Sequence, residues 1–244
     1  MGVLDFRTGY AIWAFAASVA AVSACGGASR EAKSADDASE EGEVPDVIPG
    51  LEVSGEIGGL NQEKVDETFT TTLGDLERCL NDGAERVEFL GGSVSFLVKI
   101  DLSGRLSHAF VEQSTLGDRE TEKCMLSALR ARDWPKPVGG DVGLARKSFE
   151  FDPPSDVRPP TPWSDEMLDD ALGELKEELG DCGNGSLGSV TATMYVDTDG
   201  SVLAAGIAAD DEAGEDAADC LAATLKGATF PSPGSWPAKV SFRL

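Results

Sequence analysis

The chain of 244 residues carries two copies of one sequence pattern, and this repeat constrains its fold more than any other feature. The pattern is a glycine, a cysteine 20 residues later, and a proline 11 residues after the cysteine with an aromatic residue before it. It occurs first as Gly104, Cys124 and Trp134-Pro135, and again as Gly200, Cys220 and Phe230-Pro231. Because such self-similarity marks a duplicated structural unit, we expect two modules of the same architecture. The repeat itself does not name an activity.

The N-terminal segment resembles a bacterial lipoprotein signal. Residues 11–24 form an apolar run of 14, too short for a membrane-spanning helix of about 20 residues but suited to the core of a signal peptide, 1–24. Small residues lead into Cys25, as in the lipobox, where cleavage precedes a cysteine that receives diacylglyceryl and fatty acyl (palmitate) groups. The resemblance implies that Cys25 is the lipidated N-terminus. An ordinary signal peptide followed by a chance cysteine is the alternative.

The same resemblance implies a location in the cell envelope. Gly26 follows the cysteine, as in lipoproteins that are sorted to the outer membrane, so we expect a lipid-anchored protein that faces the periplasm. Residues 25–60 are small, polar and acidic without an apolar period, which predicts a flexible tether. A functional acidic tail is the alternative for this segment.

The formal net charge of −24 is distributed unevenly, with −7 in residues 26–57, −5 in 61–152 and −12 in 164–244. An acidic excess repels phosphate backbones, so nucleic acid is not expected as a partner. It also disfavours a flat contact with an anionic lipid surface, which leaves the acylated Cys25 as the membrane contact.

Apolar periodicity predicts the same element order, helix-strand-strand-helix-strand, in residues 61–152 (module 1) and 164–244 (module 2). In module 1 we expect a helix capped by Asn61, strands 93–101 and 105–112, a helix from Asp118, and a strand ending at 151. In module 2 we expect a helix capped by Ser164, strands 188–197 and 201–208, a helix at 215–226, and a strand at 238–244. Between them, 153–163 holds five prolines and is predicted to be a semi-rigid linker.

Two apolar faces support this assignment. The first helix of module 1 should bury Val65, Phe69, Leu73, Leu76 and Leu80, and its counterpart in module 2 should bury Leu168, Leu172, Leu175, Leu179 and Cys182. The first strand of module 1 should present Val94, Phe96, Val98 and Ile100 on one side. The fold class expected from these patterns is α+β, as two tandem small modules.

Each module resembles the TonB-like C-terminal domain of the myxobacterial AgmX/PglI proteins. The matching residues are Cys79, Val94–Asp101, Gly104, Ser114-Thr115-Leu116, Cys124, Trp134-Pro135 and Phe149-Glu150-Phe151 in module 1, and Cys182, Tyr195-Val196-Asp197, Gly200, Cys220, Phe230-Pro231 and Phe242 in module 2. Module 2 is the more diverged copy, with Ala209-Asp210-Asp211 in place of the Ser-Thr-Leu turn. The resemblance implies an envelope protein that binds other envelope proteins. Strand addition is the mode implied, with Phe149–Phe151 and Phe242–Leu244 as outer strands.

Apart from Cys25, the cysteines are Cys79, Cys124, Cys182 and Cys220, two in each module. An even number in an exported chain predicts disulfides. Four cysteines allow three pairings, and the repeat favours pairing within each copy. Zinc binding and redox activity are the alternatives, but no CxxC motif or pair of histidines accompanies these cysteines.

Two further patterns have ordinary explanations. His108, the only histidine, lies on an expected strand without a nucleophile motif near it, so we expect a sheet residue rather than part of a catalytic site. Asp197-Thr198-Asp199-Gly200 resembles the start of a calcium loop, but Ala208 stands where an EF-hand would need a bidentate acid. We therefore expect a hairpin turn there, and neither a metal nor another cofactor in the chain.

A cluster of carboxylates stands at the start of the last helix, comprising Asp210, Asp211, Glu212, Glu215, Asp216 and Asp219. Acids at a helix start suit the helix dipole, so a solvated cap is the default interpretation. The alternative is a docking patch for a basic partner. The candidates for that partner within the chain are Arg130, Arg132, Lys136, Arg146 and Lys147.

Taken together, these patterns predict a lipid-anchored envelope protein that serves as a binding or scaffold component through protein–protein interaction. The alternatives are a hydrolase acting on the cell wall and a sensor of the thiol state of the envelope. No convergent set of nucleophile, base and oxyanion donors is recognisable in the sequence, so we expect a protein that is not an enzyme.

Overall fold

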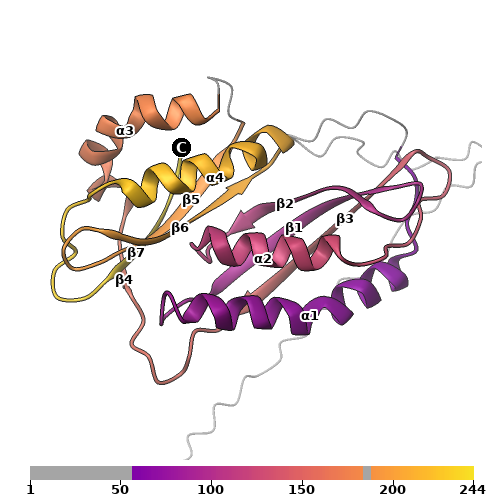
Figure 1. Cartoon of the computed structure of the whole chain (residues 1–244), viewed down its shortest axis with the longest axis horizontal. Helices are drawn as coiled ribbons and strands as arrows, with labels where there is room; N and C mark the ends of the chain where they lie inside the picture. The colour runs from indigo at the N-terminus through magenta and orange to yellow at the C-terminus, as the bar shows by residue number, and fades with distance from the viewer. Residues whose placement is uncertain (1–56, 184–187) are drawn as a thin grey trace, which may run out of the picture. The chain divides into compact units, whose positions relative to one another are not determined.

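A computed structural model describes residues 57–183 and 188–244 (Figure 1). The signal peptide, the proposed lipidation site Cys25 and nearly all of the tether lie outside the described residues. The two modules belong to one compact unit that includes everything from residue 57 onward. Within the described ranges, every helix is too short or too polar to cross a membrane.

The two modules repeat one order of elements, as predicted, and the fold is mixed α+β. Module 1 contains α1 (Gln62–Ala84), β1 (Gly92–Asp101), β2 (Leu106–Ser114), α2 (Arg119–Arg130) and β3 (Val142–Phe151). Module 2 contains the 3-10 helix η1 (Asp165–Met167), α3 (Asp169–Cys182), β5 (Val190–Val196), β6 (Val202–Ala209), α4 (Glu212–Gly227) and β7 (Ala238–Arg243), and the linker contributes β4 (Thr161–Pro162).

Both sheets place the first strand of the hairpin at the centre. The sheet of module 1 has the order β2-β1-β3, and that of module 2 has the order β4-β7-β5-β6. All neighbours are antiparallel except β4, which pairs in parallel with β7 through two residues. In each module the two helices lie together on one face of the sheet (Figure 1), and they enclose a separate hydrophobic core.

Helix α1 starts and packs as its sequence predicts. The Asn61 side chain accepts a hydrogen bond from the backbone N–H of Lys64 at 2.9 Å, which satisfies one of the free donors of the first turn. Phe69 and Leu76 are fully buried, and the Phe69 ring meets the Trp134 ring edge-on with centroids 4.8 Å apart. The aromatic residue of the repeat therefore closes the core beneath α1.

The hairpin turns explain why the repeat conserves its spacing between glycine and aromatic residue. Gly104 and Gly200 have positive φ angles of 85° and 87°, which residues with a Cβ rarely adopt. The carbonyl of Gly104 accepts from the N–H of Trp134 at 2.9 Å, and that of Gly200 from the N–H of Phe230 at 2.8 Å. Each hairpin is thus bonded to the segment that follows the second helix.

One local expectation was wrong. Ser164 makes no side-chain cap; η1 follows it, and α3 begins only at Asp169, with Leu179 as its one buried side chain. Strand β1 buries the predicted face, and it buries the opposite face as well, where Leu97 is only 1% exposed. That face is covered in part by the start of α4, where Glu212 approaches Lys99 at 3.6 Å.

Candidate functional site: a groove between the modules

Module 2 packs against module 1 through the back of its own sheet. Alternation along β5 sends Val190, Ala192, Met194 and Val196 into the core beneath α3 and α4. Thr193 and Tyr195 point the opposite way, toward module 1. The Thr193 hydroxyl donates to the carbonyl of Ser114 at 3.2 Å, and the Tyr195 hydroxyl donates to that of Gly91 at 3.4 Å. Tyr195 is 0% exposed, so this contact is a buried one.

A buried carboxylate joins α2 of module 1 to β6 of module 2. Glu122 is 0% exposed and accepts from the Ser114 hydroxyl at 2.7 Å and from the backbone N–H of Ile207 at 3.1 Å. Because β6 is an edge strand, Glu122 satisfies a backbone donor that its own sheet leaves free. Burial raises the pKa of Glu122 to about 7, against the hydrogen bonds and Arg119, which lower it.

Ion pairs surround this carboxylate at the contact of α2 with α4. Arg119 donates to Glu215 at 2.7 Å and to Asp219 at 2.8 Å, and Lys123 donates to Asp219 at 2.6 Å. The Arg119 and Glu215 side chains are only 10% and 13% exposed, so this pair is largely desolvated. The opposing carboxylates outweigh burial and raise the pKa of the Arg119 guanidinium.

The acidic cluster therefore meets basic residues of module 1, but not the predicted ones. Glu212, Glu215 and Asp219 contact Lys99, His108, Arg119 and Lys123. The proposed bases bond within their own module instead: Arg130 to the carbonyl of Ala109, Arg132 to Asp75, Arg146 to Glu112 and Lys147 to Asp66. Asp211 caps α4 by accepting from the N–H of Gly214 at 2.7 Å, which agrees with the default interpretation for that residue.

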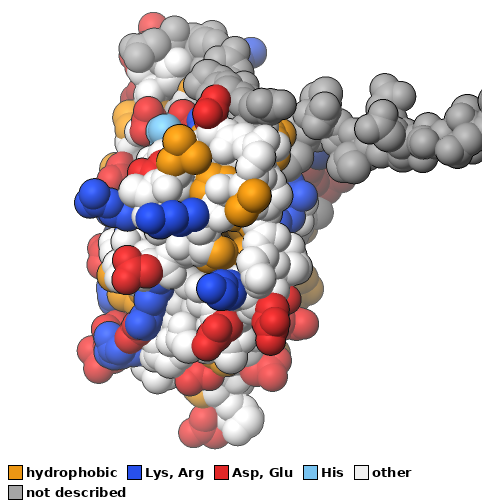
Figure 2. Space-filling view, turned by 90° about the vertical axis from the view of Figure 1, so that its right-hand side faces the viewer, with side chains coloured by type: hydrophobic (Ala, Val, Ile, Leu, Met, Phe, Trp, Pro, Cys, Tyr) orange, Lys and Arg blue, Asp and Glu red, His pale blue; other side chains and the backbone are white. Residues whose placement is uncertain are grey.

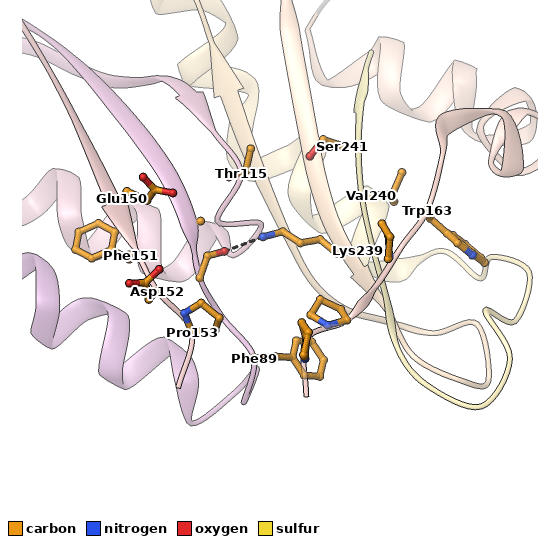
Figure 3. A pocket seen from close by; sticks show the side chains of 15 residues that line it. Phe89, Thr115, Glu150, Phe151, Asp152, Pro153, Trp163, Lys239, Val240 and Ser241 are labelled. Atoms are coloured by element: carbon orange, nitrogen blue, oxygen red, sulfur yellow. Dashed lines mark hydrogen bonds between the residues drawn. The ribbon is translucent and has the colours of Figure 1, made fainter. Parts of the chain in front are cut away.

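On the side away from α2 and α4 the two modules leave a groove of about 470 Å³ between them (Figure 3). One wall is the end of β3 with Glu150, Phe151 and Asp152, and the opposite wall is β7 from Lys239 to Ser241. Aromatic residues and prolines complete the lining. Phe89 comes from the loop between α1 and β1, and the linker contributes Pro153, Pro159, Pro160, Pro162 and Trp163. We call this space the inter-module groove.

Among the described residues, Lys239 is the only basic one that lines the inter-module groove. Its Nζ reaches across to donate to the carbonyl of Gly91 at 2.7 Å (Figure 3). The same Nζ lies 5.0 Å from the centroid of the Tyr195 ring. Burial lowers the pKa of the amine to about 8, and among the described residues no carboxylate forms an ion pair with it. The groove thus contains a partly desolvated ammonium group held by neutral partners.

The free strand edges of the sheets differ in their accessibility. The edges of β2 and β6 face the module contact, where Arg130 bonds to β2 and Glu122 to β6. Among residues 57–183 and 188–244, strand β3 has an outer partner only at its start, where Ile57 bridges Val142. Strand β4 covers β7 only at Ala238 and Lys239, so among the described residues the part expected to be an outer strand, Phe242–Leu244, has no β4 partner.

The remaining candidate residues have structural roles in the described chain. Disulfides join Cys79 to Cys124 and Cys182 to Cys220, each between the two helices of one module. Asp199 accepts from the N–H of Ser201 within the hairpin turn, and in the described ranges no group of His, Cys, Asp and Glu residues is arranged to hold a metal ion. His108 lies on β2, half exposed, with Nε2 3.1 Å from Glu212.

Sequence reasoning missed Glu122 and Arg119, which join the two modules, and Lys239, which lines the inter-module groove. The first two stand in an amphipathic helix, where charged residues ordinarily face solvent, and nothing in their spacing marks them. Lys239 carries no such signal either. The sequence repeat aligns it with Arg146, but the strand registers do not: Arg146 lies opposite Leu97, whereas Lys239 lies opposite Tyr195, which is the counterpart of Lys99.

Comparison of the chain with protein-family models, curated proteins and solved structures gives no match.

Proposed function

We propose that the chain is a lipid-anchored binding or scaffold protein of the cell envelope, which captures an extended segment of another envelope protein on the outer edge of β3. The observation that carries the proposal is the unpaired backbone of β3. In the described residues, β1 is the only partner of this strand from Leu144 to Phe151. A strand edge of this length is a template for strand addition.

The point at which the described chain begins is separate from the groove. Ile57 bridges the first residue of β3, whereas the last residue, Phe151, lines the inter-module groove. A ten-residue strand extends over about 30 Å, so the bridge at Ile57 and the groove lie at opposite ends of β3.

The entry end has a different surface. Figure 2 views module 1 from the side on which the chain enters α1, and it shows hydrophobic side chains in a small patch among basic and acidic ones. Ile57, Leu102 and Val138 are the exposed large hydrophobic residues of the described part of 57–152. The patch in Figure 2 is small, and an acidic module does not favour contact with an anionic surface, so we assign the binding function to β3 rather than to this end.

The test is site-specific photo-crosslinking in cells from position 146, on the outer edge of β3. We expect one envelope protein to be captured there and not from position 127, on the exposed face of α2. Ser148→Pro should abolish capture, because the bridge of Ile57 to Val142 shows that even-numbered residues of β3 direct their N–H outward. Ser148→Ala is the matched control and should preserve it. Capture that survives Ser148→Pro would exclude strand addition on β3.

A further inference from the structure

Lys239 is a cation without a counter-ion among the described residues. On the sheet of module 2 it lies opposite Tyr195 of β5, and its amine stands over the Tyr195 ring. The amine is directed into the inter-module groove, where its hydrogen-bond acceptor is the neutral carbonyl of Gly91.

The hydrogen-bonding capacity of this amine is not exhausted. An ammonium group has three donors, of which one is directed to Gly91, and the Tyr195 ring faces the group without accepting a conventional hydrogen bond. Burial of a charge without a counter-charge is costly, and a carboxylate is the ligand that removes this cost most directly. Thr115 and Ser241 line the same space and add polar residues to its walls.

The rest of the groove defines the body of the ligand. Its walls are aromatic rings and prolines, which accept an apolar side chain, and its volume of about 470 Å³ is in the range of sites that hold a few residues of peptide. Glu150 and Asp152 line the wall opposite Lys239 (Figure 3). The groove therefore offers a positive charge on one wall, an apolar interior and two negative charges on the other wall.

We infer that the inter-module groove binds the C-terminus of an extended polypeptide, with its terminal carboxylate on Lys239, an apolar last residue among Phe89, Phe151 and Trp163, and basic residues before it facing Glu150 and Asp152. This inference rests on the proposed function, because it places the C-terminal end of the captured segment in the inter-module groove. A basic partner segment also suits a chain whose modules carry net charges of −5 and −12.

The first test needs no variant of the protein. Acetyl-Lys-Lys-Phe is titrated into the purified full-length chain as the free acid and as the C-terminal amide, and amide resonances of Gly91, Lys239 and Ser241 are followed by NMR. The two peptides differ only in the terminal carboxylate, and we expect the acid to bind about tenfold more tightly, as for one charge-assisted hydrogen-bonded contact. Equal affinity of acid and amide would overturn the inference.

Variants then locate the contact. Lys239→Met should remove the preference for the acid, whereas Lys226→Met, at a half-exposed lysine of α4, should leave it unchanged. Glu150→Gln with Asp152→Asn should weaken both peptides by a similar factor. If acetylphenylalanine, which lacks the lysines, binds as tightly as the tripeptide acid, the occupant is a small acid and the assignment to a polypeptide end is wrong.

A final comparison separates this inference from the proposed function. Ser148→Pro removes an outward N–H of β3 and leaves Lys239 in place. If the acid preference persists in Ser148→Pro while cellular crosslinking from position 146 also persists, the carboxylate site stands and strand addition fails. If crosslinking depends on Ser148 while acid and amide bind alike, strand addition stands and the carboxylate site fails.

Discussion

Glu122 of α2 accepts a hydrogen bond at 3.1 Å from the backbone N–H of Ile207, 85 residues further along the chain. This bond connects a fully buried carboxylate of one module to the edge strand of the other. Close packing leaves no room around it, since a Cβ added to Gly206 would lie 2.5 Å from Glu122 Oε1. The relative position of the two modules thus depends on a titratable group, and this dependence leads to the first prediction.

Glu122→Gln should change how stability depends on pH. The pKa of Glu122 is raised from 4.5 to about 7 in the folded protein, so the folded state binds this proton more tightly than the unfolded state does. The stabilising effect is complete below pH 4.5 and is lost as the pH rises to about 7, amounting to up to about 3 kcal/mol. Glutamine can accept from Ile207 and donate to Ser114, so the variant should resemble the protonated protein at every pH.

The measurement is urea unfolding of the wild type and of Glu122→Gln between pH 4 and pH 8. The quantity to compare is the difference in unfolding free energy between the variant and the wild type at each pH. This difference is needed because the charges of Arg119 and Asp118 also act on Glu122. In addition, groups such as Asp219, whose pKa is lowered, change the stability of both proteins in the opposite direction at lower pH. We expect the variant to gain stability relative to the wild type as the pH rises. Parallel curves would show that Glu122 has the same pKa in both states.

Arg119 and Lys123 contact the same carboxylate, Asp219, but differ in burial. The Arg119 side chain is 10% exposed and that of Lys123 is 53% exposed. Arg119→Met leaves the largely buried Glu215 without a partner and should cost about 3 kcal/mol, the usual consequence of breaking a buried pair. Lys123→Met should cost less than about 1 kcal/mol, because solvent already screens that pair.

Urea unfolding at low and high salt tests this contrast. The effect of Lys123→Met should vanish in 1 M NaCl, where the Debye length is about 3 Å, whereas the effect of Arg119→Met should largely remain. Equal costs for both variants would show that the contact of α2 with α4 is solvated in solution.

Much of this fold was predictable because it follows from sequence patterns within each module. The capping by Asn61, the buried face of α1 and the repeated order of elements follow from spacing and residue type alone. The within-module disulfides follow from the repeat, since one cysteine lies late in the first helix of each copy and the other in the second. These features do not depend on what lies outside the module.

The contact between the modules was only half predictable. The acidic cluster of α4 was expected by default to be a solvated cap, with a docking patch as the alternative. Glu212, Glu215 and Asp219 contact module 1 as the alternative predicts, but through bases other than those proposed. Periodicity tells which face of a strand is buried by its own module, and it does not tell what covers the other face, as at Leu97 and Tyr195. For the same reason, Glu122 has the sequence context of an ordinary solvent-facing helix residue.

The hairpin glycines should be intolerant of substitution for two separable reasons. A Cβ on Gly104 would suffer backbone strain at φ 85° and would also lie 2.6 Å from the carbonyl oxygen of Trp134. Gly139 is the matched control, because it has a φ of 78° and no neighbouring atom within 4 Å of an added Cβ. Gly139→Ala should cost about 1 kcal/mol from strain alone, and Gly104→Ala should cost at least about 2 kcal/mol. Equal losses in thermal unfolding would show that the close approach of the Trp134 carbonyl oxygen to Gly104 adds nothing to the cost of backbone strain.

Removal of the two disulfides should have different effects on the helices that they join to the modules. By the chain-entropy model each should contribute up to about 4 kcal/mol, since the sequence separations of 45 and 38 residues are similar. The helices that they hold are unlike: α1 buries Val65, Phe69 and Leu76 completely, whereas α3 buries only Leu179. Without its disulfide, α1 should remain packed, while α3 should detach from the module.

Hydrogen exchange measured by mass spectrometry on the paired Cys→Ala variants tests this difference. In Cys182→Ala/Cys220→Ala, we expect residues 169–182 to lose protection while β5, β6 and β7 keep theirs, because the sheet also packs against module 1. In Cys79→Ala/Cys124→Ala, protection of 62–84 should fall only in step with global stability. Selective loss of protection in α1, with α3 unaffected, would mean that burial does not determine which helix depends on its disulfide.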